Sequence, residues 1–307
     1  MADVCLRDIM KECNSDPSAC VARAEQDYRE KIQAVADALL LGHQRVVLLA
    51  GPSGSGKTTT AGFLASLLSA AGHSASVVSL DDFYRNPEEE GYPRNAAGEL
   101  DFESVDALAV GEIHDCIDAV LTGREFLLPR FDFMNGRRFS HREPLTVPDG
   151  GFVIIEGLHA LNPRLTQDIH DSRLFRLFIS VSTNIVDDEG RCLLSGRKIR
   201  FLRRVSRDHL HRNSSAARTY ELWHGVVAGE EKHLYPFRST ADCQLDSFHR
   251  YEVGVLRGFC EPLLSVPDAP RDAYVNEIRR GLSCFPTLDA DLVPRASLLR
   301  EFIPAAE

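Results

Sequence analysis

The chain has 307 residues, enough for one large domain or two ordinary ones with a sizeable core. Hydrophobic residues make up 44% of it, as is usual for a folded protein, and its net charge of −10 argues against general nucleic-acid binding, which favours a basic surface. No apolar run approaches the roughly 20 residues that span a bilayer, and the charged N-terminus lacks the apolar core of a signal peptide. We therefore expect a soluble, cytoplasmic protein that binds neither nucleic acid nor membranes.

Eight cysteines are spread along the chain, and no two of them have C-x-x-C spacing. We expect free, mostly buried thiols, as in a protein of a reducing compartment. Cys5, Cys13 and Cys20 lie near one another in the sequence, but their spacing fits no usual zinc pattern.

The first predicted element is a helix over residues 19–41, where Tyr28, Ile32 and Leu39 share one stripe and Gly42 marks the end. A buried strand is predicted over residues 45–50, because that run is almost entirely apolar.

Residues 51–58 have the sequence GPSGSGKT, which fits the pattern G-x-x-x-x-G-K-[ST] without a gap. The glycines let the backbone turn tightly enough for successive N–H groups to converge on one anion. A helix over residues 59–68 follows, and its positive dipole end faces the same point. Lys57 then reaches the β- and γ-phosphates of a nucleotide and Thr58 binds Mg²⁺; the alternative is a glycine-rich turn without a ligand. The expected ATP phosphate-binding residues are Gly51, Ser53, Gly54, Ser55, Gly56, Lys57, Thr58 and Thr59.

The later elements alternate between strands and helices, which predicts an α/β fold with a mostly parallel sheet flanked by helices. In such sheets, ligands bind at the carboxyl ends of the strands. The last forty residues carry several prolines, and we expect short helices and loops over the surface. In chain order we expect a strand at 74–80, a loop at 86–101, a helix at 105–121, a strand at 126–128, a loop at 129–144, strands at 151–155 and 174–181, helical stretches within 187–224, and a short strand and a helix within 244–264.

Carboxylates follow two of these predicted strands. Asp81, with Asp82 beside it, leaves the strand at 74–80, where a carboxylate can accept a proton from an attacking hydroxyl or hold water on Mg²⁺. The alternative for the pair is a helix N-cap. Glu156 closes an apolar run, like a Walker B strand with Glu in place of Asp, and we expect it to serve Mg²⁺; the alternative is a structural salt bridge.

A run of arginines lies within residues 191–212. Arg203 and Arg207 are four residues apart, as are Arg200 and Arg204, so each pair can share a helix face. Guanidinium groups stabilise a phosphoryl group in transit, which favours an arginine-rich helical lid over about 187–224 that closes on ATP. The alternative is a solvated basic face.

Together these segments resemble the uridine kinase and phosphoribulokinase family of P-loop kinases over about residues 45–264. The resemblance rests on motifs that occur in the family's order: SLDDFYR at 79–85, LDFESVDA at 100–107, LPRFDF at 128–133, VIIEG at 153–157 and RRVSRD at 203–208. It implies a P-loop NTPase fold and a kinase domain over residues 43–265, between an N-terminal helical segment at 1–42 and a C-terminal extension at 266–307 packed on it.

The resemblance also implies roles for single residues. Asp81 matches the base that activates a sugar 5′-hydroxyl, and Glu103 stands where the family has an Asp that grips ribose hydroxyls. Phe131 and Gly136 replace a Tyr and a His that help to read a pyrimidine, and Arg137 with Arg138 could instead meet an anionic acceptor. The implied catalytic residues are Asp81, Lys57, Arg204 and Arg207; the implied metal ligands are Thr58, Glu156 and Asp81; the implied acceptor-binding residues are Tyr84, Phe102, Glu103, Phe131, Phe133, Arg137 and Arg138.

Residues 218–223 and 229–237 resemble a bacterial subgroup, often labelled uridine kinase, that frequently carries a threonyl-tRNA-synthetase-like N-terminal extension. About forty residues precede the phosphate loop, so we expect that extension to be absent.

The sequence thus predicts an ATP- and Mg²⁺-dependent kinase of a small-molecule hydroxyl. The 5′-hydroxyl of uridine or cytidine is the leading acceptor, and another nucleoside, a sugar or polyol, or a sugar phosphate is the alternative. Two other classes stay open: a nucleotide-binding regulatory protein without kinase activity, and a phosphate-loop hydrolase. A homo-oligomer is compatible with the sequence.

Overall fold

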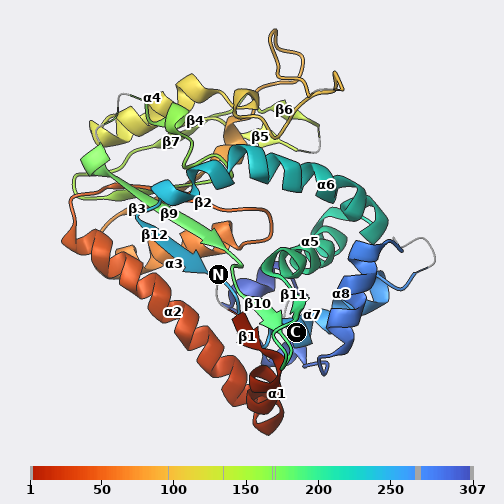
Figure 1. The fold of residues 1–307 in the computed structure, drawn as a ribbon. Coiled ribbons are helices and arrows are strands. Elements are labelled where there is room, and N and C mark those ends of the chain that lie inside the picture. Colours follow the sequence, from red (N-terminus) through yellow and green to blue (C-terminus); the bar gives the residue numbers. More distant parts are fainter. Residues whose placement is uncertain are drawn as a thin grey trace.

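A parallel five-stranded sheet forms the centre of the molecule (Figure 1). The computed structural model describes residues 3–95, 97–133, 135–167, 169, 171–266 and 271–304. The strand order is β12 (Cys243–Asp246), β9 (Leu174–Ser180), β2 (Val46–Ala50), β8 (Phe152–Glu156) and β3 (Ala75–Ser79), and all neighbouring strands run parallel. Every residue of β2 and β8 is buried, because both faces of the sheet are covered. The α/β class with a mostly parallel sheet is thereby confirmed.

The two faces of the sheet bury alternate residues of each strand. Val47 and Leu49 of β2 pack with α2 (Pro17–Leu41) and α3 (Lys57–Ala70), whereas Val46 and Leu48 pack with α4 (Val110–Leu121). In Figure 1, α4 accordingly lies on one side of the strands and α2 with α3 on the other.

A second group of elements continues the α2 and α3 side of the core. It consists of the N-terminal helix α1 and four helices after the sheet strand β9, together with a three-stranded sheet in which β10 pairs with both other strands. These elements are α1 (Leu6–Ser15), β1 (Asp3–Cys5), β10 (Asn184–Val186), β11 (Cys192–Leu194), α5 (Gly196–Arg212), α6 (Ala216–His233), α7 (Glu252–Leu263) and α8 (Ala273–Ser283).

Two predicted elements differ in the structure. The loop predicted over 129–144 contains short antiparallel ladders, in which β5 (Phe131–Asp132) pairs with β6 (Arg137–Arg138), and β4 (Phe126–Leu128) pairs with β7 (Glu143–Leu145). The helix predicted over 105–121 is interrupted before α4, because the backbone of Leu108 pairs with Tyr84.

The C-terminal part of the chain is not the surface layer that its prolines predicted. The side chains of Leu298, Leu299, Phe302 and Ile303 are fully buried in the same cluster as α2 and α3. The N-terminal helices α1 and α2 belong to that cluster as well. Residues 1–2, 267–270 and 305–307 of the two predicted terminal segments lie outside the described residues.

One cysteine pair also contradicts the sequence-based expectation. Cys13 and Cys20 form a disulfide, because the turn between α1 and α2 brings their Cα atoms to 5.2 Å. Among the free cysteines, Cys116 and Cys260 are buried, whereas Cys192 and Cys284 are exposed. Within the described ranges, no helix has both the length and the apolar character that crossing a bilayer requires.

Candidate active site

The phosphate loop connects β2 to α3 at the carboxyl edge of the sheet. Gly54 and Gly56 have φ angles of 74° and 84°, a region that favours glycine. A Cβ atom on Gly54 would lie 2.9 Å from the carbonyl oxygen of Arg200, so the loop also needs glycine there for space. Lys57 begins α3, and its Nζ donates to the carbonyl oxygen of Pro52 at 3.3 Å.

Glu156 ends β8 next to the start of α3. Its Oε1 accepts hydrogen bonds from Thr58 Oγ1 at 3.1 Å and from Ser79 Oγ at 3.2 Å, and the residue is 5% exposed. Burial raises the pKa of Glu156, while the charge of Lys57 acts in the opposite direction. The sheet therefore brings together two predicted Mg²⁺ ligands that are 98 residues apart.

The oxygen atoms of Thr58 and Glu156 suit Mg²⁺, which prefers oxygen ligands and usually keeps water and phosphate oxygens in its shell. In the described part of the chain, no three His, Cys, Asp or Glu side chains form a protein-only metal site. A hydroxyl and one carboxylate next to a phosphate loop are the donor set of a Mg²⁺ that is shared with a nucleotide.

Asp81 lies just beyond β3, in the short 3-10 helix Leu80–Phe83. Ser79 caps this helix, so the alternative role of Asp81 as an N-cap is wrong. Asp81 is accessible to solvent, but the surrounding protein removes part of its hydration and raises its pKa, while Lys57 opposes the shift. The adjacent Asp82 instead accepts hydrogen bonds from Arg130 Nη1 at 3.1 Å and from the backbone N–H of Phe131 at 3.4 Å.

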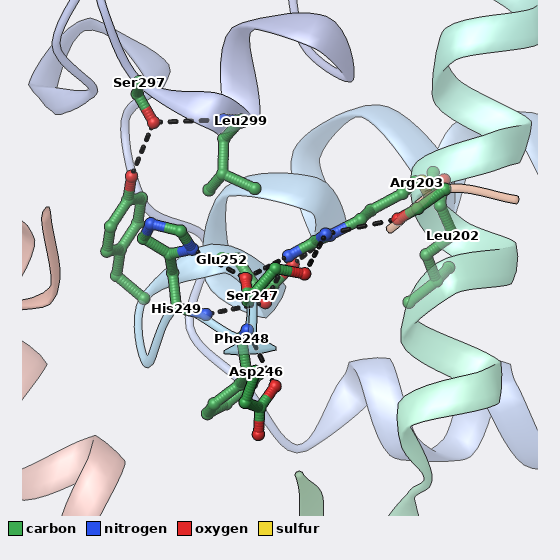
Figure 2. A network of polar contacts seen from close by, with 12 residues as sticks. Leu202, Arg203, Asp246, Ser247, Phe248, His249, Glu252, Ser297 and Leu299 are labelled. Atoms are coloured by element: carbon green, nitrogen blue, oxygen red, sulfur yellow. Dashed lines mark hydrogen bonds and ion pairs between the residues drawn. The ribbon is translucent and has the colours of Figure 1, made fainter. Parts of the chain in front are cut away.

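The arginines of α5 divide into two groups. Arg200 and Arg203 are buried in ion pairs with Glu230 and Glu252, so a solvated basic face is wrong for this pair. Figure 2 shows the Arg203 guanidinium reaching Glu252 and Ser247, and it also donates to the carbonyl oxygen of Gly54 at 3.2 Å.

Arg204 and Arg207 form the second group. Arg204 Nη1 donates to Ser53 Oγ at 2.8 Å, and its Nε pairs with Asp208 at 3.2 Å. Arg207 pairs with Asp208 at 3.2 Å and with Glu301 at 3.5 Å, and Glu301 also accepts from Thr59 Oγ1 at 3.1 Å. The charges of Arg212 and Arg207 both oppose the rise of the Asp81 pKa, less strongly than that of Lys57.

Three aromatic rings gather beyond Asp81. The ring centroids of Tyr84, Phe131 and Phe133 lie between 5.0 and 6.0 Å apart, and Phe133 is 63% exposed. The hydroxyl of Tyr84 donates to the carbonyl oxygen of Phe102, whose ring is also exposed. Burial raises the pKa of the next residue, Glu103, to about 7.

Arg138 has a structural role, and its part in acceptor binding stays a prediction. Its guanidinium donates to the carbonyl oxygens of Tyr84 at 2.7 Å and Phe83 at 3.1 Å, and it pairs with Glu112 at 2.7 Å. These bonds engage all three of its nitrogens, whereas Arg137 is exposed. Gly136 has a φ of 64° and forms the turn between β5 and β6.

Sequence reasoning missed two residues near this edge. His159 is buried three residues after Glu156, with its ring 5.7 Å from that of His233, and burial lowers its pKa to about 4. Its position after a buried strand was the signal that could have identified it. Glu230 of α6 reaches the phosphate loop, and no spacing in the sequence predicts that contact.

The sequence profile of the phosphoribulokinase / uridine kinase family matches residues 46–253. The chain belongs to this family. One relative is the uridine kinase of Saccharomyces cerevisiae. It is 25% identical to this chain over 203 residues, which cover 66% of this chain and 36% of the yeast protein. The uridine kinase of Leuconostoc citreum is 27% identical over 163 residues, covering 53% of this chain and 68% of that protein. The chain thus spans only about a third of the yeast relative's length.

One solved structure that matches this chain is that of a putative fructose transport system kinase from Silicibacter sp. TM1040. It is 21% identical, with a TM-score of 0.48, and the match covers 70% of this chain and 98% of that one.

Proposed function

We propose that this protein is an ATP- and Mg²⁺-dependent kinase that transfers the γ-phosphate to a hydroxyl group of a small molecule. The observation that carries the proposal is the hydrogen bond between Thr58 and Glu156, with Asp81 and Lys57 beside it. A phosphate loop, a metal carboxylate and a separate accessible carboxylate are the groups that phosphoryl transfer needs.

Each of these residues has a distinct chemical task. The amides of residues 54–58 and the Lys57 ammonium bind the β- and γ-phosphates. Bound to Thr58 and Glu156, Mg²⁺ would neutralise part of the phosphate charge. Asp81 accepts the proton of the attacking hydroxyl, and its raised pKa makes it a stronger base than an ordinary aspartate. Arg207 stabilises the charge that spreads over the transferred group.

The acceptor we infer is a neutral molecule with several hydroxyl groups. The rings of Tyr84, Phe131 and Phe133 offer an apolar wall, and Asp81 and Glu103 offer acceptors for hydroxyl protons. A sugar phosphate fits less well, because Arg138 is occupied by backbone carbonyls and Glu112, which leaves Arg137 alone of the predicted pair to meet an anion.

Within that class, we propose the 5′-hydroxyl of a nucleoside such as uridine or cytidine, in line with the family. A sugar or polyol is the second candidate, because Phe131 and Gly136 carry no polar group to read a base. For the same reason we expect uridine to show no large advantage over other neutral acceptors.

An ADP-release assay with Mg²⁺ and a panel of acceptors tests this proposal. The panel contains uridine, cytidine, purine nucleosides, neutral sugars and polyols, and sugar phosphates. We expect neutral acceptors to stimulate ADP release more strongly than sugar phosphates. Nucleotide binding without stimulation by any acceptor would instead support a regulatory nucleotide-binding protein, and a strong preference for uridine alone would contradict the inferred weak reading of the base.

A further inference from the structure

Ser53, the third residue of the phosphate loop, is bonded through all of its polar groups to side chains of α5 and α6. Its backbone N–H donates to Glu230 Oε1 at 2.9 Å, and its carbonyl oxygen accepts from Arg200 Nη1 at 2.8 Å. Its hydroxyl accepts from Arg204 Nη1 at 2.8 Å. Two helices whose contacting residues lie 147 to 177 positions beyond Ser53 in the sequence therefore fix one residue of the loop.

Arg200 and Glu230 also bind each other through two parallel bonds. Nη1 donates to Oε1 and Nη2 donates to Oε2, both at 2.8 Å, and the side chains are 1% and 0% exposed. Trp223 lies beside the guanidinium, 5.5 Å from ring centroid to Cζ. A bidentate pair in this setting holds a fixed geometry, because neither charge can turn toward water.

The residue before Glu230 lies against Glu103, a candidate acceptor-binding residue. A Cβ atom on Gly229 would lie 2.8 Å from Cβ of Glu103, so α6 passes close to this residue only because glycine stands there. Consecutive residues of α6 thus meet the candidate acceptor side and the phosphate loop.

We propose that Arg200 and Glu230 are positioning residues that clamp the phosphate loop through the backbone of Ser53 in its anion-binding conformation. The proposal rests on the proposed function, in which this loop binds ATP. Glu230 is fully buried and both of its oxygens are bonded, so it acts through the loop and touches no substrate. Loop amides that are already aligned bind phosphate without the free-energy cost of ordering the loop.

The first test measures hydrogen exchange of the Ser53 amide in the nucleotide-free protein. Glu230→Gln keeps the size of the side chain but removes its charge, and we expect this amide to exchange roughly tenfold faster, as loss of one charge-assisted bond implies. The matched control is Glu231→Gln, the neighbouring residue on α6, whose exposed partner is Arg197. Unchanged exchange in Glu230→Gln would overturn the clamp.

The second test measures the affinity for ATP with Mg²⁺ by calorimetry. We expect Glu230→Gln to bind roughly tenfold more weakly. The ATP affinity of Arg200→Lys should lie between that of Glu230→Gln and that of the wild type, because Lys cannot hold Glu230 and the Ser53 carbonyl oxygen in the same planar arrangement. Arg197→Lys is its matched control on α5. Equal ATP affinity in wild type and both clamp variants would overturn the proposal.

Steady-state kinetics separate positioning from general destabilisation. We expect the KM for ATP to rise in the clamp variants while the KM for the acceptor stays unchanged; equal rises in both would indicate a merely structural role. If wild type binds ATP but phosphorylates no acceptor, the proposed function fails while exchange and affinity still decide the clamp. If both clamp variants failed to fold while their controls folded, the pair would be a stability element and the proposal would fall.

Discussion

Asp81 and Asp82 are adjacent residues in different surroundings. Asp82 is engaged by Arg130 and by the backbone of Phe131, whereas Asp81 lies in the electrostatic field of Lys57, Arg212 and Arg207. Only Asp81 combines an accessible carboxylate with the cations that a phosphoryl group requires. On the proposed function, one of two identical side chains would serve chemistry, while the other holds the loop that carries the aromatic wall.

We predict that Asp81→Asn lowers kcat by roughly 10²- to 10⁴-fold, the usual contribution of a general base, with ATP affinity retained. The matched control Asp82→Asn should act mainly on the KM for the acceptor, because it loosens the segment at Phe131. Rates and ATP binding of both variants check this. An undiminished kcat in Asp81→Asn would exclude Asp81 as the base.

Glu103 gives the protein a defined pH dependence. Its pKa is about 7 in the folded protein and 4.5 in its ordinary state, so between these values the folded chain binds the proton more tightly than the unfolded chain. The free energy of unfolding therefore decreases as the pH rises through this range. We predict that Glu103→Gln weakens this decrease, measured by urea unfolding at about pH 5 and about pH 8.

The exposed residue Glu88 of the neighbouring loop offers a control, since Glu88→Gln should leave the pH dependence as in wild type. If Glu103→Gln retained the full pH dependence, the group responsible would lie elsewhere.

At the level of elements, two buried ion pairs tie α5 to its neighbours. Arg200 pairs with Glu230 of α6, and Arg203 pairs with Glu252 of α7. Both arginines also bond backbone carbonyls of the phosphate loop. The helix α5, which lies within the predicted lid, is thus built into the core, and Arg200, Arg203 and Arg204 all contact the phosphate loop.

Breaking the second pair should destabilise the fold strongly. We predict that Glu252→Ala lowers the free energy of unfolding by about 3–5 kcal/mol, because it leaves the Arg203 charge buried without its partner. Glu261→Ala on the same helix removes an exposed partner of Arg257. This variant should change the free energy of unfolding by less than about 1 kcal/mol. Urea unfolding of both variants measures the difference. Similar losses would show that the buried Arg203–Glu252 pair stabilises the fold no more than the exposed pair does.

The elements that could be predicted from the sequence are those with a continuous apolar run or a helical repeat of apolar residues. The continuous apolar runs of β2 and β8 predict their strands, and a parallel sheet then predicts that the phosphate loop, Asp81 and Glu156 share one edge. The ladder of β5 and β6 could not be predicted, because strands of two residues carry no periodicity. The partners of Arg200 and Arg203 lie 30 and 49 residues away, and only tertiary structure shows that these charges are paired.

At the level of the whole molecule, the two ends of the chain pack into one core with the phosphate-loop helix. Tyr28 of α2 bonds Thr60 of α3, and Ser297 bonds Glu25, so the contacts link residues that are up to 272 positions apart. Leu298 packs beside Gly56, where an added Cβ atom would meet its side chain. Proline content predicted loops here, but it gave no sign of this burial.

The burial of the C-terminal segment makes a direct prediction about stability. Phe302→Ala should lower the free energy of unfolding by about 3–5 kcal/mol, since the ring is fully buried and stacks near the Arg203 guanidinium. Leu127→Ala, at an exposed position of β4, should change the free energy of unfolding by less than about 0.5 kcal/mol. Thermal and urea unfolding of the two variants decide this, and a small effect of Phe302→Ala would mean that the segment is not part of the core.

The central claim is that the edge formed by the phosphate loop, Glu156 and Asp81 transfers a phosphoryl group to a hydroxyl. Following the γ-phosphate of labelled ATP, with Mg²⁺ and the acceptor panel, tests it most directly. We expect the label to reach a neutral hydroxylated acceptor and Asp81→Asn to abolish most of this transfer. Label that stays in ATP, or passes only to inorganic phosphate whichever acceptor is present, would contradict it.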